Sequence, residues 1–308
     1  MRYDLLLKHG HVIDPESGLD ARRDVAFSAG RVAAVDEAIP PESAREVVDV
    51  TGAHVVPGLV DLHAHAYIAG HDLGLETDPV CSSTGVTTLC DAGSTGAANF
   101  PGLREWVVAR AATRVLAFLH ISAIGLTHLP IGEHALLDYS NPDLAAGVAR
   151  EHRDVILGIK VREQVEVVGG HGLEPLRRGL RAAEVAGLPV IVHVNNPPVE
   201  YGEVLALLRP GDIVSHFFHG RGSGILDDRG RVKRAVHAAR RRGVLFDVAH
   251  GRNHVNFSVV RKAFEEGFYP DTISSDLTRP GRAGVVKDLP TTLSKFLSLG
   301  MPLGDVVR

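Results

Sequence analysis

Hydrophobic and polar positions follow two different rhythms along the 308-residue chain. Before residue 56, short apolar segments are separated by glycine and proline, which favour turns. The strand candidates in this region are Tyr3–Lys8, Asp24–Phe27, Arg31–Val35 and Glu46–Val50. The pattern predicts a small N-terminal β portion over residues 1–55.

From residue 56 to residue 308, short apolar runs alternate with amphipathic stretches that have helical spacing. The eight runs are Gly58–Leu62, Thr87–Asp91, Val115–His120, Ile156–Val161, Val190–Val194, Asp212–His216, Val244–Val248 and Thr272–Asp276. The clearest helical stretches between them are Phe100–Thr113, Leu173–Ala186 and Asn256–Glu266. Gly187 and Gly267 follow the last two, where helices commonly end. Eight strands alternating with helices predict a parallel sheet that closes into a (β/α)₈ TIM-type barrel.

An open, doubly wound sheet is the structural alternative to the barrel. Such a sheet would carry a glycine-rich phosphate-binding turn after its first strand. Here the first strand ends in His63 and His65 instead. We therefore expect an α/β protein whose barrel follows the small β portion.

Composition narrows the choice of partners. The chain is 44% hydrophobic and 23% charged, with a net charge of -4 and a pI near 6.5, as in ordinary soluble proteins. This balance favours neither nucleic acid nor a membrane surface as a partner. No apolar run reaches about 18 residues, no signal peptide is evident, and the two cysteines form no disulfide framework. We expect a cytoplasmic protein that binds a small molecule.

Ionisable residues stand where several of the predicted barrel strands end. They are His63, His65, Lys160, His193, His216 and Asp276. Because the carboxyl ends of barrel strands open into one shared mouth, these side chains should converge there. His63 and His65 are two residues apart in a strand, so both point to the same face, as zinc ligands would.

Each of these residues also has an ordinary structural explanation. A single histidine such as His193 or His216 is more often a buried, hydrogen-bonded side chain than a ligand. Asp276 could cap a following turn, and Lys160 could form an ion pair at the rim. Taken together, these explanations would need five coincidences of position, so we favour a metal centre.

The same residues lie in segments that resemble the amidohydrolase superfamily. The matching segments are PGLVDLHAH, GIK, VIVHV, DIVSHF and TISSDL at the first, fourth, fifth, sixth and eighth predicted strands. STGVTTLCDAGS, IVHVNNPPVEYGEVL and FDVAHG look like the deacetylase branch, whose relatives are often described as dihydroorotase-like. The N-terminal β portion resembles part of the β-sandwich of that superfamily. Its relatives usually continue past Arg308, so the fold expected here is truncated at its C-terminus. The sequence leaves open whether the chain forms a homo-oligomer.

The resemblance implies a centre of two divalent metal ions, zinc in the first instance. His63, His65 and Asp276 would hold one ion, and His193 and His216 the other. Lys160, carboxylated to a carbamate, would bridge them. Asp276 would also serve as the catalytic proton shuttle for an attacking water activated by metal.

These features predict a zinc-dependent hydrolase of carbon–nitrogen bonds, a deacetylase acting on an N-acyl or O-acyl carboxylic acid. Ring opening of a cyclic amide is the nearest alternative. A phosphoesterase or lactonase, and a barrel that only binds other proteins, are further alternatives. A deaminase is disfavoured, because mononuclear deaminases of this superfamily do not use the lysine of the fourth strand.

Strand parity suggests how the substrate would be held. Arg162 lies two residues after Lys160 on the same side of its strand and could grip a carboxylate. Asn195 stands in the same relation to His193, and His250 ends the seventh strand. Arg162 could instead pair with Glu163 or Glu166 as a structural contact at the rim.

Overall fold

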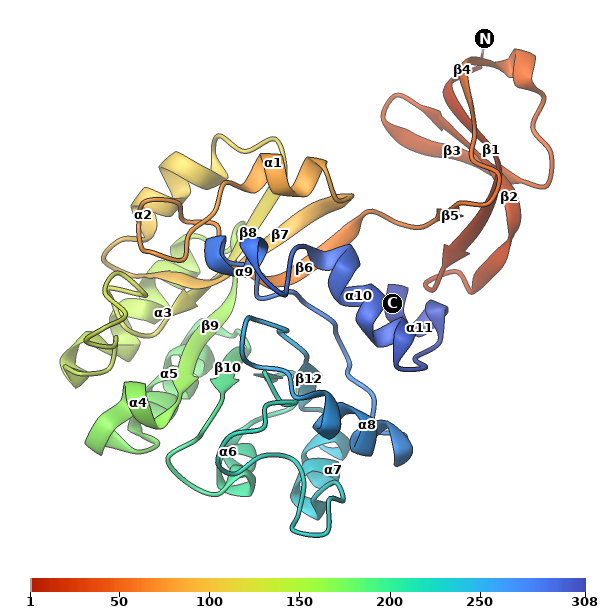
Figure 1. Ribbon diagram of the computed structural model, residues 1–308. Coiled ribbons are helices and arrows are strands. Elements are labelled where there is room, and N and C mark those ends of the chain that lie inside the picture. Colours follow the sequence, from red (N-terminus) through yellow and green to blue (C-terminus); the bar gives the residue numbers. More distant parts are fainter. Residues whose placement is uncertain (1) are drawn as a thin grey trace. The chain divides into compact units, whose positions relative to one another are not determined.

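The computed structural model describes residues 2–308, and the chain divides into two units (Figure 1). One comprises residues 2–59 together with Phe296–Arg308, and the other is Val60–Lys295. Among the described residues, no helix is both long and apolar enough to cross a membrane.

The first unit is built on a small β-sheet. Its strands are β1 (Tyr3–Asp14), β2 (Leu19–Ser28), β3 (Arg31–Asp36), β4 (Ala44–Asp49) and β5 (His54–Val55), in the order β3-β2-β1-β4 with β5 also on β1. β1 is antiparallel to β2 and parallel to β4. Tyr3, Leu6, Ala26, Ile39 and Ala44 form the buried core of this sheet. All four predicted strands are present, but β1 extends beyond its predicted end, β2 begins before its predicted start, Val50 lies outside β4, and β5 was not predicted.

The second unit contains the sheet that carries the strand-end residues. Its strands are β6 (Leu59–Ala64), β7 (Val86–Gly96), β8 (Arg114–His120), β9 (Ile156–Glu163), β10 (Val190–Val194), β11 (Ile213–Ser215) and β12 (Leu245–Asp247), paired in sequence order. The pairs from β7 to β12 are parallel. All five residues of β10 are buried, as expected for a strand covered on both faces.

The eighth predicted strand, Thr272–Asp276, is not a regular strand. Single parallel bridges join Asp247 to Thr272 on one side and Ala64 to Leu277 on the other. Backbone hydrogen bonds from Val248 N to Thr272 O (3.0 Å) and from Asp276 N to His63 O (2.6 Å) connect the same neighbours. Asp276 has a positive φ of 48°, which interrupts an extended ladder. The segment therefore closes the ring between β12 and β6 without forming a strand of its own.

Helices follow the strands of this unit. They include α1 (Thr77–Ser82), α3 (Pro142–Glu151), α4 (Val165–Val168), α5 (Glu174–Ala186), α6 (Tyr201–Leu207), α7 (Arg234–Arg241), α8 (Phe257–Glu265), α9 (Arg279–Ala283) and α10 (Leu289–Ser298). The predicted helices ending at Gly187 and Gly267 are confirmed as α5 and α8, with positive φ at both glycines. In the C-terminal segment of the first unit, α11 (Leu303–Val307) contacts β1.

The predicted helix Phe100–Thr113 is wrong in length. Only α2 (Phe100–Leu103) is α-helical, and a π-helical turn, Arg104–Val108, follows it. The carboxylate of Asp78 accepts hydrogen bonds from the backbone N–H groups of Ala112 and Thr113, both at 2.9 Å. These bonds hold the chain in a non-helical path just before β8.

Candidate functional site

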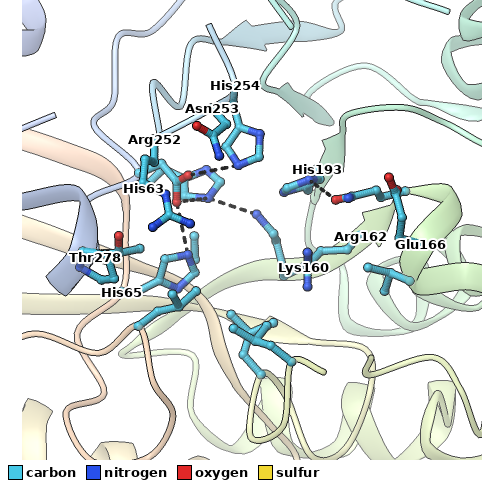
Figure 2. Close-up of a pocket in the computed structure, with 18 of the residues that line it drawn as sticks. His63, His65, Lys160, Arg162, Glu166, His193, Arg252, Asn253, His254 and Thr278 are labelled. Atoms are coloured by element: carbon cyan, nitrogen blue, oxygen red, sulfur yellow. Dashed lines mark hydrogen bonds and ion pairs between the residues drawn. The ribbon is translucent and has the colours of Figure 1, made fainter. Parts of the chain in front are cut away.

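Five of the six predicted strand-end residues line one cavity of about 410 Å³ (Figure 2), and the sixth, His216, packs against His193. His63, His65, Lys160, His193 and Asp276 line it directly. His63 lies in β6 and His65 directly after it, and the others come from β9, β10 and the segment that closes the ring, so the fold gathers residues up to 213 positions apart (276 minus 63). The mouth of the barrel is therefore the candidate active site.

His63, His65 and Asp276 form a first group of potential metal ligands. One ligand atom from each lies within 4.8 Å of the others. The Nε2 atom of His65 is 3.2 Å from Asp276 Oδ1, and that of His63 is 3.6 Å from the same oxygen. Two imidazoles and one carboxylate at this spacing match the donor set that zinc and similar ions prefer.

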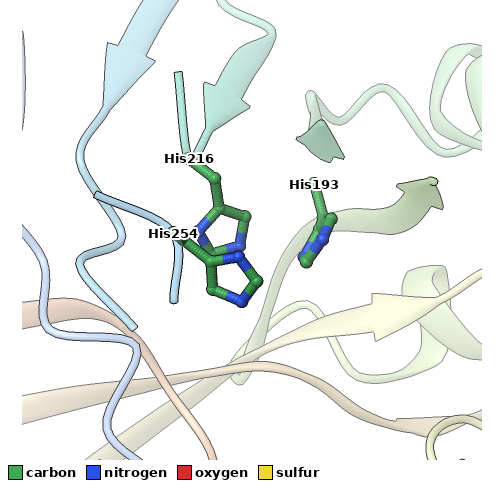
Figure 3. A group of neighbouring side chains, drawn as sticks. All are labelled: His193, His216 and His254. Carbon is green, nitrogen blue, oxygen red and sulfur yellow. The ribbon is translucent and has the colours of Figure 1, made fainter. Parts of the chain in front are cut away.

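His193, His216 and His254 form a second such group (Figure 3). The rings of His193 and His216 have centroids 4.1 Å apart, and those of His216 and His254 are 4.2 Å apart. His216 Nδ1 donates to the backbone oxygen of Ala249 at 2.7 Å. Since a carbonyl can only accept, the Nδ1 atom carries the proton and Nε2 is left with a free lone pair. That buried Nε2 has no hydrogen-bond partner among residues 2–308.

Lys160 lies between the two groups. Its Nζ is 3.1 Å from His63 Nε2, and the side chain is fully buried. The pKa of Lys160 is lowered to about 7, chiefly by burial and also by the nearby charge of Arg162, while Asp276 opposes the shift. A large fraction of this amine is therefore neutral at neutral pH, which is the reactive form of a lysine.

Burial also keeps the histidines uncharged. The pKa values of His63, His193 and His216 lie well below the ordinary 6.5, chiefly because burial disfavours the cation. Neighbouring positive groups, including Lys160, add to the effect. Neutral imidazole is the form that binds a metal ion, so the site holds these rings ready for ligation.

Local backbone geometry serves the same arrangement. His216 and Asp276 both have positive φ, 67° and 48°, which non-glycine residues rarely adopt. Gly93 is required beside Lys160, because a Cβ atom there would lie 2.5 Å from the lysine Cγ. Strained backbone at two candidate ligands is typical of functional sites.

No family model matches the chain, but individual relatives do. The deacetylase Atu3266 of Agrobacterium fabrum is 37% identical over 285 residues, which cover 91% of this chain and 69% of that protein. A deacetylase of Enterococcus faecalis is 32% identical and covers 100% of this chain and 82% of its own length. The chain belongs to the deacetylases of the amidohydrolase superfamily.

Solved structures agree with this assignment. A dihydroorotase superimposes with a TM-score of 0.89 at 34% identity, covering 98% of this chain and 80% of that one. An adenine deaminase gives a TM-score of 0.89 at 31% identity, covering 99% and 81%. The chain is a hydrolase of amide or acyl bonds, and its histidine and aspartate groups are suited to the divalent metal that this chemistry uses. Its substrate is a small molecule.

His254 was not predicted. It lies in the loop between β12 and α8, so no strand end marked it, and the only signal was its nearness in sequence to His250. Its Nδ1 is 2.6 Å from Asn195 Nδ2, and its Nε2 is 3.8 Å from Asp276 Oδ2. The structure therefore brings Asn195 to the site through a histidine rather than directly into the cavity.

The other two predicted substrate contacts differ in placement. Arg162 lines the cavity, and its Nη1 donates to both carboxylate oxygens of Glu133, at 2.9 and 3.1 Å. Neither Glu163 nor Glu166 is its partner. His250 is absent from the described residues that line the cavity, and Lys295 Nζ lies 3.1 Å from its Nε2.

A third buried group, His120, Glu133 and His134, also has ligand atoms within 4.8 Å of one another. Here Ser122 N–H donates to His120 Nδ1 at 3.0 Å. The neutral ring must then carry its proton on Nε2, which lies 3.4 Å from Glu133 Oε1. With a proton on Nε2 and a cationic Arg162 on the same carboxylate, this group is arranged for hydrogen bonding rather than for binding a cation.

Proposed function

We propose that the chain removes the acyl group from a small N-acylated or O-acylated carboxylic acid. The observation that carries this proposal is that one cavity is lined by His63, His65, Lys160, His193 and Asp276, with His216 packed against His193 behind them. Relatives named as deacetylases support the reaction type.

In this proposal, two divalent ions, most simply zinc, occupy the two groups of ligands. His63, His65 and Asp276 would hold one ion, and His193 and His216 the other. Bound metal would lower the pKa of a water molecule toward about 7 and polarise the acyl carbonyl. His254 lies close enough to the second group to complete it or to contact the substrate.

Lys160 would join the two groups as a carbamate. Its neutral amine would add to carbon dioxide, forming an N–C bond and releasing one proton. The product is an anion with two oxygens, which suits two neighbouring cations better than an ammonium group does. The lowered pKa of Lys160 supports this step, because only the uncharged amine is nucleophilic.

Asp276 would move the proton. Its carboxylate would accept a proton from the attacking water and pass it to the leaving nitrogen or oxygen as the acyl bond breaks. Oδ1 faces His63 and His65, while Oδ2 faces His254. Arg162 would contribute its remaining N–H groups to an anionic part of the substrate.

A substrate panel tests this function. The zinc-loaded protein should hydrolyse N-acetyl or O-acetyl acids, and chelator-treated protein should not until zinc is restored. Cyclic ureides and organophosphates belong in the same panel, since solved dihydroorotases resemble this chain. Turnover of cyclic ureides alone would replace deacetylation by ring opening. If the metal-loaded protein turned over none of these substrates, the alternative of a non-catalytic barrel that only binds other proteins would remain.

A further inference from the structure

Some of the charged side chains that line the cavity have ion-pair partners, and others do not. The basic side chains are Lys160, Arg162 and Arg252, and the carboxylates are Glu166 and Asp276. Lys160 and Asp276 belong to the metal centre of the proposed function. The remaining charged groups decide how the cavity receives an anion.

Arg162 is largely neutralised by Glu133. Glu133 is 1% exposed, and both of its oxygens accept from Arg162 Nη1. Burial would raise the pKa of Glu133, but the opposing effect of Arg162 and His120 is larger, and the pKa lies below its ordinary value. Glu133 therefore stays ionised at neutral pH, so an approaching anion meets an ion pair there rather than a free cation.

Glu166 is paired as well. Arg221 Nη2 lies 2.5 Å from Glu166 Oε1, and Asn196 Nδ2 donates to the same oxygen at 3.3 Å. Arg252 differs from both of these groups. Among residues 2–308 it has neither a carboxylate within ion-pair distance nor a side-chain hydrogen bond.

The backbone fixes where Arg252 begins. His250 N donates to Ser274 O at 2.9 Å, and Gly251 N donates to Ser275 O at 3.0 Å. A Cβ atom on Gly251 would lie 2.4 Å from Asp276 Oδ2, and its φ of +53° also favours glycine. The chain therefore passes directly against Asp276 and delivers Arg252 to the rim beside it. In Figure 2, Arg252 stands on the side of His63, and Arg162 stands on the opposite side, beyond Lys160.

We propose that Arg252 is the main specificity-determining residue for the anionic group of the substrate. Its planar guanidinium can donate two parallel hydrogen bonds to a carboxylate while the acyl group rests over the metal ligands. Arg162, whose charge Glu133 offsets, makes a smaller contribution and shapes the opposite wall. This inference rests on the proposed deacetylase function and deepens it.

Steady-state kinetics of zinc-loaded variants test the inference. The substrates are the N-acetyl amino acid that the wild type hydrolyses best and its carboxamide, which has the same shape without the charge. Arg252→Met should raise KM for the acid by roughly 10- to 100-fold and change kcat far less. The carboxamide should react almost as it does with the wild type. Arg252→Lys should recover part of the loss, because it keeps the charge but not the two-pronged donor.

Two matched variants complete the experiment. Arg162→Met should raise KM for the acid less than Arg252→Met does. Arg261→Met removes an exposed arginine of α8 without touching the cavity and should leave both substrates unchanged. Equal losses on acid and carboxamide in Arg252→Met, or a larger effect at Arg162, would overturn the inference. Failure of the wild type to hydrolyse either substrate would count against the proposed function instead.

Discussion

The barrel contains two similar groups of potential metal ligands. One, at the mouth, consists of His63, His65 and Asp276, and the other consists of His120, Glu133 and His134. Both sets are buried, and both have ligand atoms within 4.8 Å of one another. The two groups differ in the hydrogen-bond partners of their imidazole nitrogens. His65 Nδ1 lies near the hydroxyl of Ser94, which can accept, whereas His120 Nδ1 accepts a backbone N–H.

His216 and His120 show the rule most clearly. A carbonyl oxygen holds the proton of His216 on Nδ1 and frees its Nε2, while an amide N–H forces the proton of His120 onto Nε2. Residue types and burial are alike, but one ring is left able to act as a metal ligand and the other is held as a hydrogen-bond donor. Hydrogen bonding around a histidine therefore decides its chemistry as much as its position in the barrel does.

The largest expected effect comes from Asp276. Asp276→Asn should lower kcat by at least about 100-fold, because the amide cannot carry the proton. Glu133→Gln is the matched change in the other group and should lower kcat far less. Steady-state assays of both variants with the best acetylated substrate give the comparison. Near-normal turnover in Asp276→Asn would remove the proton-shuttle role.

Lys160 gives the next largest effect. Lys160→Ala should lose bound zinc and most activity, since the bridging anion is gone. Short carboxylates such as acetate or propionate should restore part of both by filling the space of the missing carbamate. Metal analysis and activity measured over a series of acetate concentrations would quantify this rescue. Full zinc content and full activity in the unrescued variant would contradict the bridge.

Substitutions of histidine should separate the two groups by metal content. His216→Ala should reduce the zinc bound per chain, because it removes an imidazole whose buried Nε2 has no hydrogen-bond partner among residues 2–308. His120→Gln should leave zinc content unchanged, since Gln keeps a polar group without offering a metal-binding nitrogen. Elemental analysis of dialysed proteins reads both outcomes. Loss of zinc in His120→Gln alone would reverse the assignment of the two groups.

The smallest expected effect is a pH-dependent change in thermal stability, and it concerns the buried carboxyl group of Glu163. Burial raises the pKa of Glu163 from 4.5 to about 8, so the folded chain holds this proton more tightly than the unfolded chain. Its stabilising effect is complete below about pH 4.5 and is lost as the pH rises toward 8. Glu163→Gln keeps an acceptor for Leu176 N–H and cannot ionise.

The Tm of Glu163→Gln minus the Tm of the wild type should therefore increase as the pH is raised from 4.5 to 8.5. This difference in Tm should change by an amount on the order of 5 °C over that range. Glu184→Gln, an exposed change on α5, should show no such trend. A parallel pH dependence for wild type and Glu163→Gln would mean that Glu163 is not a proton-binding group of the folded state.

Much of this architecture could be predicted from periodicity. Apolar runs bounded by turns located β6 to β12, because strands buried on both faces leave a clear signal. The closing segment Thr272–Asp276 carries a weaker signal, since Ile273 is its only apolar residue. Its positive φ at Asp276 depends on contacts with β6 and β12 that no local pattern carries.

The site shows the same division. His63, His65, Lys160, His193, His216 and Asp276 could be located because strand ends of a barrel share one mouth. His254 and Glu133 lie in loops, whose paths depend on tertiary contacts. The structural alternative for Arg162 therefore considered only its sequence neighbours Glu163 and Glu166, although Glu133, 29 residues earlier, is its partner.

Anomalous X-ray diffraction at the zinc edge, from crystals of zinc-loaded protein, tests the central claim most directly. The account predicts two peaks per chain, one bounded by His63, His65 and Asp276 and one by His193 and His216. It predicts no peak between His120, Glu133 and His134. A peak in that third group, or a fully loaded chain with a single peak, would contradict the account.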